Sequence, residues 1–100
     1  MSRIFDIARG ALSAFGSKLQ GAAANIANMN SPGYRPSVTT LASRVDGGVE
    51  ARLAERPEGD TVDISTEAVA MIEAEHGVKA AVVLIKTEDE RQQTTLDILG

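Results

Sequence analysis

Apolar residues recur along residues 3–30 at alternating spacings of three and four, which is the pattern of a helix with one continuous apolar face. This seam contains only apolar side chains: Phe5, Ala8, Leu12, Phe15, Leu19, Ala22, Ile26 and Met29. An unbroken heptad seam is typical of helices that pair as a coiled coil. We therefore predict a first helix over residues 3–30 that packs against a second helix.

A second stripe on the same helix contains only small residues: Gly10, Ala14, Ser17, Gly21 and Ala24. It lies about 160° around the helix from the apolar seam, given ~3.6 residues per turn. Two interpretations stay open. The small residues are either tolerated, at a cost of up to ~1 kcal/mol for each interior glycine, or they let another helix approach closely.

The first helix is followed by residues that favour a sharp exit into an extended strand. Asn28 or Asn30 can end the helix in a left-handed conformation. Pro32 biases the preceding residue towards extended geometry, and Gly33 supplies freedom of φ. Tyr34 then either covers the end of the helix or contacts a partner.

Residues 36–56 predict a β-hairpin. The segment from Ser37 to Val45 is rich in β-branched residues, and residues 49–55 alternate apolar with charged side chains. Between them, Asp46-Gly47-Gly48 is a strong signal for a tight turn. Because a lone hairpin is marginally stable in water, we expect it to rest on the helices or on a neighbouring chain. Residues 57–63 read as a polar linker.

Residues 64–99 predict a second helix, capped by Asp63 or Ser65. Its expected seam follows one heptad register: Ile64, Ala68, Met71, Val78, Val82, Ile85, Leu96 and Leu99, with polar interruptions at Glu75, Asp89 and Gln92. The predicted fold class is therefore mainly α. We expect an antiparallel helical hairpin, or coiled coil, of the N- and C-terminal helices with a short β-hairpin between them, in a single domain over residues 1–100.

The predicted core is thin. Hydrophobic residues make up 43% of the chain, but there are only two phenylalanines, one tyrosine and no tryptophan. Since the gain on burial scales with apolar area, a core of alanines stabilises a chain of this size weakly. The chain is expected to complete its packing against other chains.

Charge is divided unevenly between the two halves of the chain. Residues 1–56 carry seven basic and four acidic side chains, and residues 57–100 carry three basic and ten acidic ones, which gives the net charge of −4. Either this is a solvated acidic face, or the halves attract each other or complementary neighbours. The absence of a basic stripe argues against nucleic-acid binding.

No pattern in the sequence indicates catalysis or a cofactor. There is no cysteine, the single histidine, His76, lacks further metal ligands at a suitable spacing, and no glycine-rich phosphate loop occurs. The acidic run Glu88-Asp89-Glu90 reads as a solvated helix face. The start of the chain lacks the basic-then-apolar pattern of a secretory signal, and no apolar run is long enough to cross a membrane. We expect neither an enzyme, nor a bound metal, nor membrane insertion.

Two segments carry a family resemblance. Residues 25–34 resemble the N-terminal signature Asn-x-Ala-Asn-x-x-Thr/Ser-Pro-Gly-Tyr/Phe of the flagellar basal-body rod and hook proteins. Residues 62–74 are similar to the C-terminal signature of the same family, in the same order along the chain. That signature usually continues with Tyr and then Ala-Asn, where this chain has Val78, Ala80 and Ala81.

The resemblance implies a structural subunit of the bacterial flagellar rod that is important for motility. In this family the terminal helices pair and line the core of a tubular axial structure, while the segment between them faces outward. The very short segment here is closest to the small proximal rod proteins. Partners would be other rod subunits, in a homo- or hetero-oligomer, and the flagellar type III export apparatus. Location would be the periplasmic rod, reached without a cleaved signal peptide.

The resemblance and the seams together nominate two groups of residues for assembly. The packing group is Leu12, Phe15, Leu19, Ile26, Met71, Val78, Val82 and Ile85, and the turn group is Asn25, Asn28, Pro32, Gly33 and Tyr34. The alternative interpretation, motivated by the short middle segment and the departures from the C-terminal signature, is a soluble rod-like paralogue. Such a protein would act as an adaptor or regulator of flagellar export or assembly.

Overall fold

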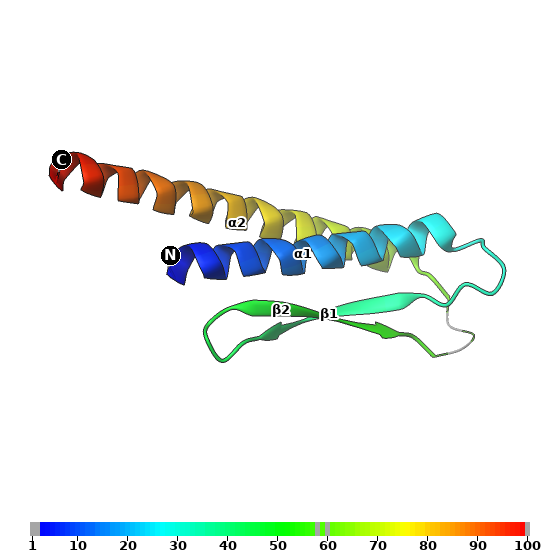
Figure 1. The fold of residues 1–100 in the computed structure, drawn as a ribbon. Coiled ribbons are helices and arrows are strands. Elements are labelled where there is room, and N and C mark those ends of the chain that lie inside the picture. Colours follow the sequence, from blue (N-terminus) through cyan, green and yellow to red (C-terminus); the bar gives the residue numbers. More distant parts are fainter. Residues whose placement is uncertain (1–2, 58, 60, 100) are drawn as a thin grey trace.

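Two long helices and one β-hairpin make up the protein. The computed structural model describes residues 3–57, 59 and 61–99, and within them the order is α1 (Arg3–Asn28), β1 (Ser37–Ser43), β2 (Val49–Glu55) and α2 (Ile64–Leu99) (Figure 1). The molecule is elongated, with principal extents of 62 × 24 × 16 Å. The predicted mainly-α fold, with two terminal helices and a hairpin between them, is confirmed.

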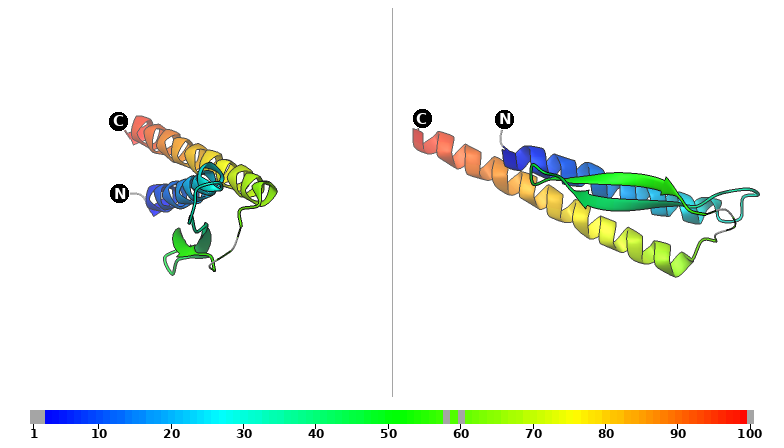
Figure 2. Two further views of the ribbon diagram at one scale, coloured as in Figure 1. Left: turned by 90° about the vertical axis from the view of Figure 1, so that its right-hand side faces the viewer. Right: turned by 90° about the horizontal axis from the view of Figure 1, so that it is seen from below.

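Helix α1 is the central layer of the molecule. Helix α2 runs antiparallel along one side of it, and the hairpin lies against another side (Figures 1 and 2). Within the described residues, both strands contact α1, whereas neither contacts α2. The last turns of α2 extend beyond the start of α1, so they have no helix beside them (Figure 1).

The face of α2 that packs on α1 is built from small and acidic residues. Its buried positions are seven residues apart: Glu67, Ala74, Ala81 and Glu88. Half-buried residues alternate with them at spacings of four and three: Met71, Val78, Ile85 and Gln92. This is a heptad seam whose centre is lined by alanine and closed near each end by a glutamate.

The predicted register of α2 is right for Met71, Val78 and Ile85, which are half-buried, and wrong for Ile64, Leu96 and Leu99, which are exposed. Val82 lies one position outside the seam and is 49% exposed, while Glu75 and Asp89 also lie outside it and are exposed. The reason is that the helices approach closely at Gly77, where an added Cβ would collide with the ring of Phe15. Alanines fit this narrow space better than the larger side chains of the predicted register.

The seam of α1 lies where its apolar pattern places it, except at Met29, which follows the end of the helix and is exposed. Leu12, Phe15, Leu19 and Ile26 are half-buried, and the most enclosed positions are alanines and Asn25. The aromatic ring of Phe15 sits over Gly77 of α2. Large side chains of α1 therefore fill the space that small residues of α2 leave open.

The stripe of small residues on α1 is covered by the hairpin, and not by another helix. A Cβ added at Gly21 would lie 2.7 Å from Oγ1 of Thr39 in β1. At Gly10 it would lie 3.8 Å from the backbone oxygen of Val49 in β2. The approach is tight at Gly21 and of ordinary van der Waals length at Gly10, so the stripe from Gly10 to Gly21 is a docking face for the sheet, while Ala24 is exposed.

Local signals account for the ends of the elements. Asp63 caps α2, since its Oδ1 accepts hydrogen bonds from the backbone N–H groups of Ser65 and Thr66 at 2.9 and 3.3 Å. At the hairpin tip, the N–H of Gly47 donates to the oxygen of Arg44 at 3.1 Å, and Gly47 has φ of +90°. This closes the turn that Asp46-Gly47-Gly48 predicted.

The exit from α1 differs in one detail from the prediction. Neither Asn28 nor Asn30 adopts a left-handed conformation, because no residue other than glycine in the described chain has a positive φ. Two successive turns follow α1 instead, closed by hydrogen bonds from Ser31 N to Asn28 O at 2.9 Å and from Tyr34 N to Ser31 O at 3.2 Å. The left-handed position falls on Gly33, with φ of +74°.

Candidate functional site

Asn25 is the centre of a hydrogen-bond network in which the four elements meet. It is buried, with 1% of its surface exposed, one turn before the end of α1. Its Oδ1 accepts from the hydroxyl of Tyr34 at 2.7 Å and from the N–H of Ser37 at 3.0 Å. Its Nδ2 donates to the oxygen of Ser37 at 2.8 Å and to Oε1 of Glu67 at 3.1 Å. Both donors and both acceptor positions of the amide are used.

The amide of Asn25 pairs with Ser37 as a neighbouring strand would. The even-numbered residues of β1 direct their backbone N–H and C=O groups towards β2. This follows from the hydrogen bonds at the two ends of the ladder, from Arg44 N to Gly48 O and from Arg56 N to Pro36 O. Ser37 therefore points its N–H and C=O away from β2, and Asn25 bonds to both. The side chain anchors the start of β1 to α1 and closes the edge of the sheet at this position.

Glu67 connects this network to α2 and to the end of the hairpin. Its carboxylate, with 3% of the residue exposed, accepts from Asn25 and from the guanidinium of Arg56, which directly follows β2. Arg56 is itself held by the backbone, since its N–H donates to Pro36 and its oxygen accepts from Nη2 of Arg35 at 2.8 Å. A buried carboxylate is tolerated here because it is both paired and hydrogen-bonded.

The structure brings only two members of the predicted turn group into this network, Asn25 and Tyr34. Asn28 bonds back to the oxygen of Ala24 at 2.9 Å, while Pro32 and Gly33 are exposed and shape the turn. Tyr34 is half-buried and directed at Asn25, so it supports the helix end as one of the two interpretations had it. Arg35 forms an ion pair with Glu55 at 3.1 Å at the hairpin's base.

Sequence reasoning did not identify Ser37, Arg56 or Glu67 as partners of Asn25. Ser37 and Glu67 are 12 and 42 residues away from Asn25 along the chain. One signal was available for Glu67, which lies one heptad before Ala74 and two before Ala81. An acidic residue on that line is a sign of a buried charge that requires a specific partner.

A second buried carboxylate lies near the far end of the seam, at Glu88. Its two oxygens accept from Nε and Nη2 of Arg91 at 3.0 and 2.6 Å, and one of them also accepts from Gln92 at 3.2 Å. The hydrogen bond with Glu88 and the charge of that carboxylate raise the pKa of Arg91. The prediction that the acidic run lies on a solvated helix face is therefore correct for Asp89 and Glu90. It is wrong for Glu88, which is buried.

The second feature of functional interest is the apolar surface of α2 that α1 leaves uncovered. Large apolar side chains stay exposed on several sides of this helix and on its overhanging end: Ile64, Val69, Ile72, Val82, Val83, Leu84, Leu96, Ile98 and Leu99. Of the nominated packing group, Val82 belongs to this exposed set. The other seven members are half-buried between the helices.

The described residues hold no cluster of three side chains suited to a metal ion. None of their helices is long and apolar enough to span a membrane. The hollows on the surface are shallow spaces between elements, such as the one of about 190 Å³ between the α1 exit and residues 61–62. What distinguishes this molecule is its internal polar network and its uncovered apolar helix surface.

Comparison with known proteins gives one match. The model of the family described as "Flagella basal body rod protein" matches residues 5–35, which span α1, its exit turn and two of the five network residues, Asn25 and Tyr34. No curated protein matches the chain. The match covers the apolar seam of α1 and the N-terminal signature at residues 25–34, whereas the second signature, at residues 62–74, lies outside it. By its N-terminal helix and the turn that follows, the chain is similar to the flagellar basal-body rod proteins.

Proposed function

We propose that the protein is a structural subunit of the flagellar rod that assembles by packing its helices against those of neighbouring subunits. One observation carries this proposal: α2 is covered by α1 along one side only and exposes large apolar residues elsewhere, among them Val69, Val83 and Leu84. A helix that is apolar on several sides is normally buried. In a polymer, the helices of adjacent subunits would supply the missing cover.

The weak core of the single chain supports the same proposal. Among the described residues, the buried hydrophobic core consists of five alanines, and no larger aliphatic or aromatic side chain is buried to the same extent. Because stabilisation scales with buried apolar area, contacts between chains would contribute a large share of the total. The nominated seam residues would hold α1 and α2 together, and Val82 would contact a neighbouring subunit.

The family match supports location in the basal body, and we extend this to the periplasmic rod. The partners would be other rod subunits, and delivery would use the flagellar type III export apparatus without a cleaved signal. The structural role requires no cofactor and no catalytic residue. The turn group would act indirectly, by fixing the angle at which the hairpin leaves the helical pair.

Cofractionation tests this proposal directly. An epitope-tagged chain should be retained in hook–basal bodies after detergent purification and a salt wash, at a constant ratio to other rod subunits. Quantitative loss to the soluble fraction would overturn the structural role and favour a soluble adaptor or regulator of flagellar assembly.

A pair of substitutions makes the test specific for the surface of α2. Val82→Asp places a carboxylate on the exposed apolar surface, whereas Thr87→Asp places one at an exposed polar position of the same helix. We expect Val82→Asp to remain folded by circular dichroism but to be absent from basal bodies and to abolish motility. Thr87→Asp should be incorporated. Equal incorporation of both variants would contradict the role of this surface.

A further inference from the structure

The outer edge of β2 is open. Since even-numbered residues of the two strands bond to each other, Val49, Ala51, Leu53 and Glu55 direct their backbone N–H and C=O groups away from β1. At the start of β1 the equivalent groups of Ser37 are bonded by Asn25. No such partner exists for the β2 edge within the described part of the chain, where α1 is the only other element that contacts the hairpin. An unprotected edge is a template for another strand.

The side chains of β2 are complementary to a second, antiparallel copy of the same strand. If Ala51 lies opposite Ala51 of the second copy, Glu50 lies opposite the second Arg52, and Val49 lies opposite the second Leu53. In this register, the residues whose backbone groups point outward from β2 also lie opposite one another, as hydrogen bonding between the two copies requires. Within one strand, Nη2 of Arg52 already bonds to Oε1 of Glu50 at 2.8 Å. The two copies would therefore form a square of four alternating charges.

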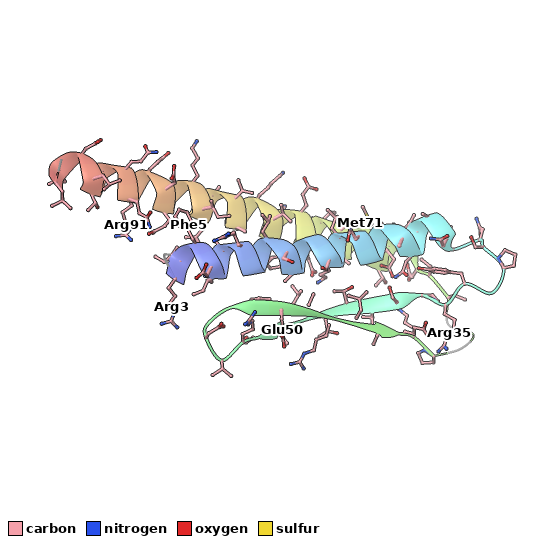
Figure 3. All side chains as sticks on the ribbon, viewed as in Figure 1. Arg3, Phe5, Arg35, Glu50, Met71 and Arg91 are labelled. Atoms are coloured by element: carbon pink, nitrogen blue, oxygen red, sulfur yellow. The ribbon has the colours of Figure 1, made fainter. Side chains whose placement is uncertain are left out.

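This arrangement would bury the side chain of Leu53. It lies on the face of the hairpin turned towards α1, yet it is 64% exposed. Beside Val49 and Ala51, under Gly10, Ala14 and Ser17 of α1, there is a hollow of about 210 Å³. The Leu53 of a second copy, opposite Val49, would enter that hollow. Glu50 points away from α1, so the charges would meet on the other face (Figure 3).

We propose that two copies of this chain associate through their β2 edges into a continuous four-stranded antiparallel sheet, with the two-fold axis at Ala51. Such a contact uses the same patch on both chains and closes on itself, so it produces a dimer and cannot propagate a filament. It is therefore distinct from the helix contacts proposed for the rod, and it describes the chain outside the rod. Its failure would leave the rod proposal unaffected.

Sedimentation equilibrium on the full chain, carried to about 1 mM so that a weak contact is populated, tests this association. The wild type should dimerise, and added salt should weaken the dimer because the charge square is exposed to solvent. Each single reversal, Glu50→Arg or Arg52→Glu, should weaken dimerisation by about tenfold or more, since favourable cross-strand pairs become unfavourable ones. A monomeric wild type would overturn the proposal.

One mixture and one double variant separate the proposed register from loss of folding. The Glu50→Arg and Arg52→Glu chains, mixed in equal amounts, restore opposite charges across the edge and should form a heterodimer. The chain that carries both reversals keeps the alternating square and should dimerise like the wild type. If the single variants dimerise as well as the wild type, or if their mixture stays monomeric, the β2 edge is not the contact.

Discussion

Replacing Asn25 by alanine tests whether the network at the end of α1 holds the fold together. The substitution removes an amide that is 1% exposed and makes four hydrogen bonds, to Tyr34, to both backbone groups of Ser37 and to Glu67. The hydroxyl of Tyr34 is only part-buried and can turn to water. The edge groups of Ser37 and one contact of Glu67 lose their partner beneath α1.

The expected loss follows from what each group can recover. A hydrogen bond contributes ~0.5–1.5 kcal/mol net, and a buried group left without a partner costs ~1–3 kcal/mol. The bonds to Tyr34 and Ser37 are part-buried, so water can replace some of them, and Glu67 keeps Arg56. The loss therefore corresponds to four hydrogen bonds at the net value above. We expect Asn25→Ala to lower the free energy of unfolding by about 3 kcal/mol, a large part of the ~5–15 kcal/mol typical of small domains.

Urea unfolding followed by circular dichroism measures this loss as a lower midpoint at an unchanged slope. Asn28→Ala is the matched control, because Asn28 lies on the same helix and bonds only one turn back, to Ala24; it should change stability by less than ~0.5 kcal/mol. In a double-mutant cycle, Tyr34→Phe should cost less in the Asn25→Ala chain than in the wild type. Equal losses for Asn25→Ala and Asn28→Ala would refute the reasoning.

Four further substitutions test the packing of α1 and the turn that follows it. Gly77→Ala drives a methyl into the ring of Phe15 and should destabilise the protein by about 1–3 kcal/mol, whereas Gly16→Ala, with open space around it, should stabilise it by up to ~1 kcal/mol. Thermal unfolding of the two variants should show opposite shifts of the melting temperature, and shifts of the same sign would contradict the close approach of the helices at Gly77. Gly33→Val places a β-branched residue at φ of +74° and should lower the free energy of unfolding in urea by about 1–2 kcal/mol. An unchanged midpoint would show that the turn does not require a left-handed residue at this position. Thr39→Val removes a buried hydroxyl that has no hydrogen-bond partner, so it should stabilise the protein by about 1 kcal/mol and raise its melting temperature. A lower melting temperature would show that the hydroxyl has a role.

Regular patterns in the sequence predicted the elements well. The spacing of apolar residues in α1 defines the helix and the face on which Leu12, Phe15 and Leu19 meet α2. Alternation and the Asp-Gly-Gly turn define the hairpin. These features depend on residues close together in the chain, and their physical causes act locally.

The prediction was wrong where packing between distant segments decides the outcome. The α2 register followed the larger apolar side chains and so included Val82, but Gly77 opposite Phe15 brings the backbones together and selects Ala74 and Ala81. Similarly, Ser37 and Glu67 are brought to Asn25 from β1 and α2 by the tertiary structure. For the small stripe on α1, the option of a closely approaching second helix was wrong, because the hairpin lies against it.

The layer order also determines how force passes through the subunit. Because the hairpin and α2 both contact α1 and not each other, a load applied to the hairpin reaches α2 through α1. The ion pair between Arg56 and Glu67 is a direct tie that bypasses the central helix, at the end where the chain passes from the hairpin to α2. At the other end, the hairpin tip is tied to α1, since Nη2 of Arg3 donates to the oxygen of Asp46 at 2.9 Å, and neither strand contacts α2 in the described part of the chain. A load on the tip therefore reaches α2 through α1, whereas a load on the base also passes directly through the Arg56–Glu67 ion pair.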